Sequence, residues 1–324
     1  MKRIALLVSV LIFSTFMVSA QSINDAGAKF NEANESFKAK DYAKAIESYT
    51  EALNMCEALG EEGAELGEKI KKQIPNAYVN QGKTQMQNKD LDGAITTLTT
   101  AISEAQKYNN EKAEKSANKL LSNAYLVKAG NAYQAKDFDN ALDMCGKAIA
   151  SNAAATKAYL YETLIYSEQN DEEKMIEAAN LTIKYAMASK EPDEKTASQA
   201  KSTAYTYFIN KAQEAFGKKK YADAVTDLDK ALQFDEQSQT AFYLKASSLN
   251  FQGKHDDAIA TALLGLEAPD NDHTQFLGIN LELARAYEAK GDTENACKYY
   301  KIAAQSPNFK AEAEGKMKDV LKCN

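Results

Sequence analysis

Two histidines are the side chains best suited to hold a metal ion. His255 is followed directly by two aspartates, and His273 follows Asp270 and Asp272 in the segment Ala268–Gln275. A metal site needs several ligands at fixed spacing, and His255 lacks them. We therefore interpret His255 as part of a solvated helix start. For His273, a cation site is the alternative to an ordinary polar loop.

Four cysteines are the candidate nucleophiles, and their spacing matches neither a CxxC redox motif nor a zinc site. The chain also lacks a Gly-rich phosphate loop, a nucleophile elbow and a zinc-binding helix motif. We therefore predict that the protein is not an enzyme and needs no cofactor or metal. The cysteines are Cys56, Cys145, Cys297 and Cys323.

The first twenty residues predict export. Lys2 and Arg3 precede an almost unbroken apolar run, and Val18-Ser19-Ala20 supplies small residues for cleavage before Gln21. We expect a signal peptide at residues 1–20 and a periplasmic or secreted protein, with an uncleaved membrane anchor as the alternative. No cysteine lies near the cleavage point, which disfavours lipid attachment. We expect no membrane span after cleavage, because no second apolar stretch is long enough.

The charge balance disfavours nucleic acid as a partner. The chain has 46 acidic residues against 39 Lys and Arg, a net charge of −7, and cleavage would remove two of the basic ones. Nucleic-acid binding depends on neutralising phosphates. Beyond the signal peptide the only arginine is Arg285, so two-pronged recognition of phosphate or carboxylate is nearly unavailable.

A short phrase recurs seven times and indicates the elements that position these residues. Each copy has a polar turn, often with an Asp, followed by a small residue that opens a helix. The copies are KDYAKA (40–45), KDLDGA (89–94), KDFDNA (136–141), NDEEKM (170–175), KKYADA (219–224), GKHDDA (253–258) and GDTENA (291–296). Such an internal repeat predicts a solenoid of stacked helical pairs.

The spacing of the copies resembles the tetratricopeptide repeat. The interval is 34 residues from Ala141 to Met175 and again from Ala224 to Ala258, and 34 is the period of that family. The last repeat shows the family pattern best, with Leu283, Ala284, Tyr287, Gly291, Ala296, Tyr300, Ala303 and Pro307. The resemblance implies an all-α, right-handed superhelical solenoid of about seven hairpins, whose small residues let helix backbones approach closely.

Some repeats depart from this pattern. The other intervals are 38, 47 or 49 residues, and we interpret the excess as lengthened helices near Gly60–Lys72, Ala105–Asn118 and Ala188–Ser202. Repeat four has Thr163, Met175 and Thr182 at positions that are usually small, so we expect it to be splayed or wrongly assigned. Any function particular to this chain is expected in the stretched repeats or in the groove between them.

The domain organisation follows from the repeats. We predict an N-terminal array of about four repeats at 21–187, a linker or helix extension at 188–202, and a C-terminal array of about three repeats at 203–324. All four prolines (Pro75, Pro192, Pro269 and Pro307) are expected to lie between hairpins, since proline inside a helix costs ~3 kcal/mol. Asn308–Leu321 is predicted to be a capping helix, with Phe309, Ala313, Met317 and Leu321 on one face.

The resemblance implies that the first helix of each hairpin lines a concave groove. Aromatic and amide side chains there would suit an extended peptide or a helix, although packing between repeats is the alternative for each aromatic. The candidate groove residues are Phe30, Asn34, Phe37, Val79, Asn80, Lys83, Tyr133, Tyr161, Asn210, Gln213, Phe216, Tyr243, Asn250 and Arg285.

The family's clamp for chaperone C-terminal carboxylates is incomplete in this chain. Asn34 and Asn80 match its two Asn positions, but Phe30 replaces the first Lys, and Asn123 and Val127 replace the final Lys and Arg. Chaperone-tail binding is therefore not expected.

The repeat assignment also suggests one disulfide. Cys297 would lie near the start of the last repeat's second helix, and Cys323 at the end of the antiparallel capping helix. A Cys297–Cys323 bond could pin the cap, with two separate thiols as the alternative. Cys145 falls on a core position and is interpreted as a buried small hydrophobe, and Cys56 has no evident partner.

The sequence therefore favours an exported scaffold that binds a protein or peptide in the cell envelope. The alternative is a carbohydrate-binding protein on a tetratricopeptide-like scaffold, which the absence of Trp disfavours. An enzyme is the least favoured class. The identity of the partner cannot be predicted from the groove residues.

Overall fold

The structure is a computed structural model that describes residues 22–188, 190–269 and 273–323. Within those ranges it contains fifteen α-helices, two short helical turns of other types and no strand, which confirms the all-α prediction. The predicted signal peptide, residues 1–20, lies outside the described residues. The helices are α1 (Ile23–Lys38), α2 (Tyr42–Ala58), α3 (Ala64–Gln87), α4 (Leu91–Lys107), α5 (Glu111–Gln134), α6 (Phe138–Ser151), α7 (Thr156–Gln169), α8 (Glu172–Met187), α9 (Glu194–Gly217), α10 (Tyr221–Phe234), α11 (Gln239–Phe251), α12 (His255–Glu267), α13 (His273–Ala289), α14 (Thr293–Ala303) and α15 (Pro307–Gly315).

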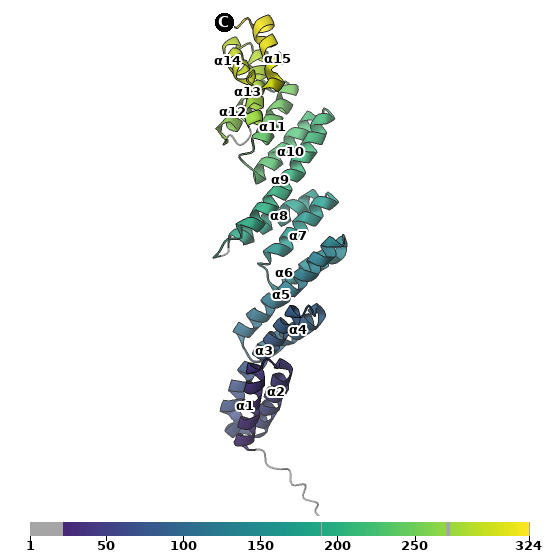
Figure 1. Ribbon diagram of the computed structural model, residues 1–324, viewed down its shortest axis with the longest axis vertical. Helices are drawn as coiled ribbons and strands as arrows, with labels where there is room; N and C mark the ends of the chain where they lie inside the picture. Colours follow the sequence, from purple (N-terminus) through teal and green to yellow (C-terminus); the bar gives the residue numbers. More distant parts are fainter. Residues whose placement is uncertain (1–21, 189, 270–272, 324) are drawn as a thin grey trace, which may run out of the picture. The chain divides into compact units, whose positions relative to one another are not determined.

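The helices pack in consecutive pairs, as predicted (Figure 1). The chain divides into two compact units between Tyr125 and Leu126, within α5. In the first unit α1 pairs with α2 and α3 with α4. In the second, the pairs are α7–α8, α9–α10, α11–α12 and α13–α14, and the end of α5 packs against α6 through Tyr133 and Phe138.

The recurring phrase forms the turn inside each hairpin. Lys40, Lys89 and Lys136 adopt left-handed backbone conformations, with φ of 63°, 64° and 59°. The Asp that follows each Lys then caps the next helix by accepting a hydrogen bond from a backbone N–H three residues later. Asp171 caps α8 in the same way, so in four of the repeats the Asp of the turn starts the second helix of the hairpin.

The small residues bring the helices of each pair together. Ala45, Ala94, Ala141, Ala224 and Ala296 have no exposed surface. The backbone of α3 at Gly82 lies still closer to α4. A Cβ at this position would lie only 2.6 Å from Leu98 Cγ, so a larger residue would not fit without a shift. The predicted role of small residues in helix approach is therefore confirmed.

Repeat four forms a normal hairpin, contrary to our expectation. Thr163, Met175 and Thr182 are fully buried, and α7 packs against α8. The two threonine hydroxyls donate to the carbonyls of Tyr159 and Ala178, both at 2.8 Å. Because these bonds stay within each helix, the larger side chains fit without leaving a buried polar group unsatisfied.

The stretched repeats contain the longest helices. The helices α3, α5 and α9 have 24 residues each, which confirms the prediction of lengthened helices. Within the predicted segment 188–202, residues from Glu194 onward belong to α9, and Ala197 and Ala200 are buried. Since α8 and α9 pack against each other, this part is a helix extension, and the compact units do not divide there.

Pro75 corrects another expectation, because it lies buried inside α3 rather than between hairpins. Proline has no N–H and disrupts the preceding helical turn. Near Pro75, the Lys72 carbonyl accepts side-chain hydrogen bonds from Asn76 at 2.8 Å and Asn110 at 3.1 Å. We expected Pro75 between hairpins, but α3 begins at Ala64 and therefore includes Pro75. The other three prolines lie between helices or, for Pro307, at the first turn of α15.

The C-terminal segment caps the last hairpin, as predicted. It consists of α15 followed by a π-helical turn at Lys316–Leu321. Ala313 is fully buried, and Phe309, Met317 and Leu321 pack against the core of α13 and α14. This segment therefore covers the apolar end of the final repeat.

Candidate ligand-binding groove

Three neighbouring cavities follow α9 in the second unit. The largest, about 830 Å³, lies beside α7. A cavity of about 340 Å³ shares Lys195 and Gln199 with it, and one of about 380 Å³ shares Lys211 and Glu214. Because each neighbour shares lining residues with the central cavity, the three form one continuous surface, which we name the α9 groove.

The central part of the α9 groove is lined by uncharged hydrogen-bonding groups. Its lining from α9 begins at Lys195 and ends at Glu214, a distance of about 28 Å along the helix. Between these ends stand hydroxyl and amide side chains, and α7 adds Ser167 and Asn170. The groups from α9 are Ser198, Gln199, Ser202, Thr203, Thr206, Tyr207 and Asn210. Such groups can both donate and accept hydrogen bonds.

An ionic cluster holds the end of the groove where α8, α9 and α10 meet. Glu172 accepts a hydrogen bond from Lys211 at 2.6 Å and another from Lys230. Lys211 also lies 3.4 Å from Asp227. Burial would raise the pKa of Glu172, but the two lysine hydrogen bonds outweigh it and hold that pKa below its ordinary value. These lysines are therefore committed to the fold rather than to a ligand.

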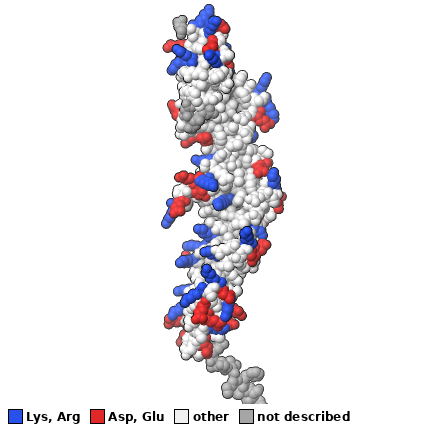
Figure 2. All heavy atoms as spheres, in the orientation of Figure 1, with Lys and Arg blue, Asp and Glu red and all other residues white. Residues whose placement is uncertain are grey.

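The remaining surface charges are mixed. On the face shown in Figure 2, basic and acidic side chains are interspersed. That face carries no extended patch of one sign, which nucleic acid would require.

Some of the predicted groove residues from the second unit line cavities. Asn210 lines the central cavity and Tyr161 the adjoining one. Tyr133 packs against Tyr161 with ring centroids 5.7 Å apart and donates to Glu168. Gln213 is exposed on α9 but lines none of these cavities.

Other predicted groove residues pack against their neighbours. Phe30 joins the buried cluster around Tyr49, and Phe37 packs edge-on against Tyr42. Asn34 accepts a hydrogen bond from the Tyr49 hydroxyl at 2.7 Å. Tyr243 joins the C-terminal core. These side chains fill the space between packed helices, and Tyr243 lies against Gly278.

The predicted residues on α3 remain near the surface. Asn80 donates to the Asn76 carbonyl of its own helix at 2.8 Å. Val79 packs against the core between α4 and α5, while Lys83 is exposed. None of these three residues lines the cavities along α9.

The individual hydroxyl residues that line the α9 groove were not predicted from the sequence. Ser198, Ser202 and Thr206 belong to no family motif, so the repeat pattern gave them no role. The available signal was the stretched interval before Ala224, which adds helical turns to α9. Spacing of three or four residues along that extension places these side chains on one face.

A separate pocket of about 340 Å³ lies between α11, α12 and α13. We name it the Phe251 pocket, and it is lined by Asn250, Phe251, His255, Glu282 and Arg285. Phe216, another predicted groove residue, lies beside it, because its ring contacts Phe251 with centroids 5.7 Å apart. The predicted residues Asn250 and Arg285 are thus brought together, whereas Asn210 is in a different cavity.

Arg285 is held by two carboxylates. Its Nε and Nη2 donate to Glu312 at 2.8 and 2.7 Å, and its Nη1 donates to the buried Glu282 at 2.7 Å. Burial raises the pKa of Glu282 even though Arg285 and Asn250 donate to it. The single arginine of the second unit therefore links α13 to the capping segment.

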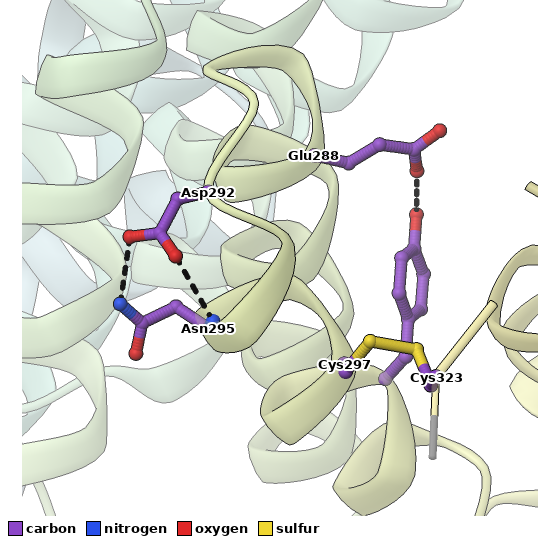
Figure 3. Close-up of a disulfide and its surroundings, with 6 residues drawn as sticks. Glu288, Asp292, Asn295, Cys297 and Cys323 are labelled. Carbon is purple, nitrogen blue, oxygen red and sulfur yellow. Dashed lines mark hydrogen bonds between the residues drawn. A yellow bond between two sulfur atoms is a disulfide. The ribbon is translucent and has the colours of Figure 1, made fainter. Parts of the chain in front are cut away.

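Two further links hold the cap. Cys297 and Cys323, the pair suggested by the sequence, form a disulfide with Cα atoms 5.8 Å apart (Figure 3). Glu288 accepts hydrogen bonds from Tyr300 at 2.5 Å and Lys316 at 2.6 Å. We name these links, together with Arg285–Glu312, the C-terminal clasp.

The remaining reactive side chains are two cysteines and two histidines. Cys56 and Cys145 are buried free thiols, and burial raises the pKa of Cys145 to about 12, which keeps it protonated. His255 Nδ1 lies 3.3 Å from Asn250 Oδ1. His273 stacks on Phe276, and the aspartates proposed to share a cation with it, Asp270 and Asp272, lie outside the described residues.

Comparison with protein-family models matches three segments of the chain. Tetratricopeptide-repeat models match residues 75–108, 209–273 and 281–308. The chain contains tetratricopeptide repeats. Proteins built from such repeats generally act as scaffolds rather than enzymes. Residues 209–273 include the end of α9 and all of α11, and so reach both the α9 groove and the Phe251 pocket.

Solved structures with similar helical repeats show low identity. The complex of the yeast Sti1 TPR2AB domain with pHSP90 is 16% identical, with a TM-score of 0.40, and the match covers 93% of this chain and 98% of that one. The C-terminal part of a TPR repeat-containing protein from Cytophaga hutchinsonii is also 16% identical, with a TM-score of 0.34 and coverage of 88% and 98%. No curated protein matches the chain.

No helix among the described residues is both long and apolar enough to cross a membrane.

Proposed function

We propose that this protein is an exported tetratricopeptide scaffold that binds an extended protein segment along the α9 groove, in the cell envelope. The observation that carries the proposal is the continuity of three cavities along one 24-residue helix. A surface about 28 Å long suits an extended segment of about eight residues. The export part of the proposal is supported by the N-terminal sequence pattern alone.

The groove chemistry fits a polypeptide backbone. Hydroxyl and amide side chains can pair with both the N–H and the C=O groups of an extended chain. Tyr161 and the neighbouring Leu160 and Leu164 offer an apolar surface for a side chain at one end. Such a combination gives affinity through the backbone and selectivity through the end pocket.

The test is site-specific photocrosslinking from Asn210 in cells that export the full chain, followed by binding measurements with the purified captured protein. Asn180, an exposed asparagine on α8, provides the matched control position. We expect crosslinks from position 210 and not from 180, and saturable binding that the double substitution of Thr206 and Asn210 to Ala weakens at least tenfold. Equal capture from both positions would contradict the proposal.

A carbohydrate ligand is the second candidate, and one observation favours it. Between Lys195 and Lys211 the groove wall from α9 has no charged side chain and includes Tyr207, a lining that also suits sugar hydroxyls. A glycan array probed with the full chain separates the two functions. Saturable glycan binding that depends on Tyr207 would favour the carbohydrate.

A further inference from the structure

We propose that the start of the α9 groove binds the carboxylate of an acidic side chain in the partner segment. This inference rests on the proposed function and adds the charge of one partner residue and the end of the groove where that residue lies. The site is the cavity of about 340 Å³ at the first turn of α9, which we name the end pocket. It is carried by a surplus of positive charge in the lining, by the contrast with the opposite end of the groove, and by an apolar wall.

The charged side chains that line the end pocket are two lysines and one aspartate. Lys157 comes from α7, Lys195 comes from α9, and Asp193 directly precedes α9. The Asp193 carboxylate is already occupied, because it accepts hydrogen bonds from the backbone N–H of Thr196 at 3.1 Å and from the Thr196 hydroxyl at 2.7 Å. These bonds hold the pKa of Asp193 below its ordinary value, and the charges of Lys157 and Lys195 add to that shift. Two ammonium groups with one carboxylate leave a surplus of one positive charge in the lining.

The opposite end of the groove has no such surplus. Its cavity is lined by three lysines and three carboxylates, and they form the pairs Lys211–Asp227, Lys218–Glu214 and Lys220–Asp223. Among the described residues, Lys157 and Lys195 form no ion pair and no side-chain hydrogen bond, and both are exposed. The groove therefore offers unneutralised positive charge at one end only. Charge complementarity places an acidic residue of the partner at the start of α9.

The wall beside these lysines favours a side chain over a small anion. Leu160 is buried, Tyr161 and Leu164 are half-buried, and all three line the end pocket. The methylene groups of an acidic side chain can cover this apolar surface while its carboxylate lies between the ammonium groups. Gln199 adds an amide that can donate to the same carboxylate.

The test uses fluorine NMR of the full chain with Tyr161→3-fluorotyrosine. The probes are acetyl-Ala-Glu-Ala amide, its neutral isostere acetyl-Ala-Gln-Ala amide, and acetyl-Ala-Gln-Ala with a free carboxyl terminus. We expect a saturable shift with the Glu probe and about fivefold weaker binding of the other two, as exposed ion pairs supply. Added salt should weaken binding of the Glu probe and not of the amidated Gln probe. A second reporter, Tyr42→3-fluorotyrosine in the first unit, should not respond.

The double substitution of Lys157 and Lys195 to Gln provides the charge control. Lys201→Gln is the matched variant, because Lys201 is an exposed lysine of α9 that lines none of the three cavities. Since all three lysines are exposed, both proteins should retain their helicity. The double variant should bind the two amidated probes equally, and Lys201→Gln should bind them as the wild type does.

Three results would overturn the inference. They are equal binding of the Glu and amidated Gln probes by the wild type, binding of the free-carboxyl probe as tight as that of the Glu probe, and no response of Tyr161 to any probe. An equal loss of Glu-probe binding in Lys201→Gln and in the double variant would also contradict it. If crosslinking from Asn210 persists in these cases, the proposed function stands and only the acidic partner residue fails.

Discussion

In the α9 groove the polar side chains face solvent, whereas in the C-terminal clasp they face one another. Ser202, Thr206 and Asn210 are exposed along the groove wall. In the clasp, Arg285 and Glu288 hold their hydrogen-bond partners within 2.5–2.8 Å. Both regions belong to the second unit and are built on helices, so what differs is how their polar side chains are partnered.

This comparison separates two ways of using polar residues in a helical repeat. A group that is already satisfied within the protein stabilises the fold and has little left for a ligand. An exposed polar group contributes little to the free energy of unfolding and remains available to bind a ligand. Substitutions in the two regions should therefore have opposite effects on stability and on binding.

The largest effect is expected from opening the disulfide. Closing a chain segment of 26 residues restricts the unfolded chain and is worth about 3.5 kcal/mol. The double substitution of Cys297 and Cys323 to Ser should lower the free energy of unfolding by this order and release the cap first. The free energy is measured by urea unfolding, and release of the cap by hydrogen exchange of α15. An unchanged exchange rate in α15 would mean that the disulfide does not hold the capping segment.

Arg285→Met should cost about 3 kcal/mol, because it leaves the buried Glu282 without its cation. The expected loss is measured by urea unfolding at neutral pH. Arg285→Lys is the matched control, since it retains the charge but loses the two-pronged contact with Glu312. If Met and Lys are equally well tolerated, the clasp does not depend on the Arg285 charge.

Glu162 should make the stability of α7 sensitive to pH. Burial raises its pKa to about 7, from an ordinary value near 4.5, and Glu177 adds to the shift. The folded state therefore binds the proton more tightly than the unfolded state, and stability falls as pH rises between about 4.5 and 7. After allowance for partial exposure, the loss is about 1–2 kcal/mol.

The check compares urea unfolding of the wild type and Glu162→Gln at pH 5 and pH 8. The two proteins should differ little at pH 5, and the Gln variant should be the more stable at pH 8. Hydrogen exchange should show the change in α7 and not in α13 or α15. A wild type as stable as the Gln variant at pH 8 would contradict the assignment.

The smallest effect on stability is expected in the groove itself. Asn210→Ala and the matched Asn180→Ala should each change the free energy of unfolding by less than about 0.5 kcal/mol, since both side chains are exposed. Only Asn210→Ala should weaken partner binding. A substantial loss of stability in Asn210→Ala would mean that the groove wall, like the clasp, is structural.

The sequence predicted features that repeat or that follow from helix geometry. The Lys-Asp turns, the fully buried alanines and the lengthened helices all follow from spacing. Cys297 and Cys323 could be paired because they fall on adjacent antiparallel helices. Pro75 could not be placed, since repeat spacing does not tell where an added helical segment begins.

The site was less predictable because a groove position does not determine what fills the groove. Phe30 and Tyr161 were both predicted to line the groove, yet Phe30 packs onto Tyr49 while Tyr161 lines a cavity. Arg285 was expected to face a ligand, and it lines the Phe251 pocket. Its guanidinium is nevertheless occupied by Glu312, an acceptor 27 residues away in the cap that the repeat pattern does not reveal.

The most direct test of the groove is the affinity of the crosslinked partner segment, made as a synthetic peptide, for three forms of the full chain. Fluorescence anisotropy would compare the wild type, Asn180→Ala, and the double substitution of Thr206 and Asn210 to Ala. We predict equal affinity for the first two and at least tenfold weaker binding for the third, with unchanged helicity. Equal affinity for all three forms would contradict the assignment of the α9 groove as the binding surface.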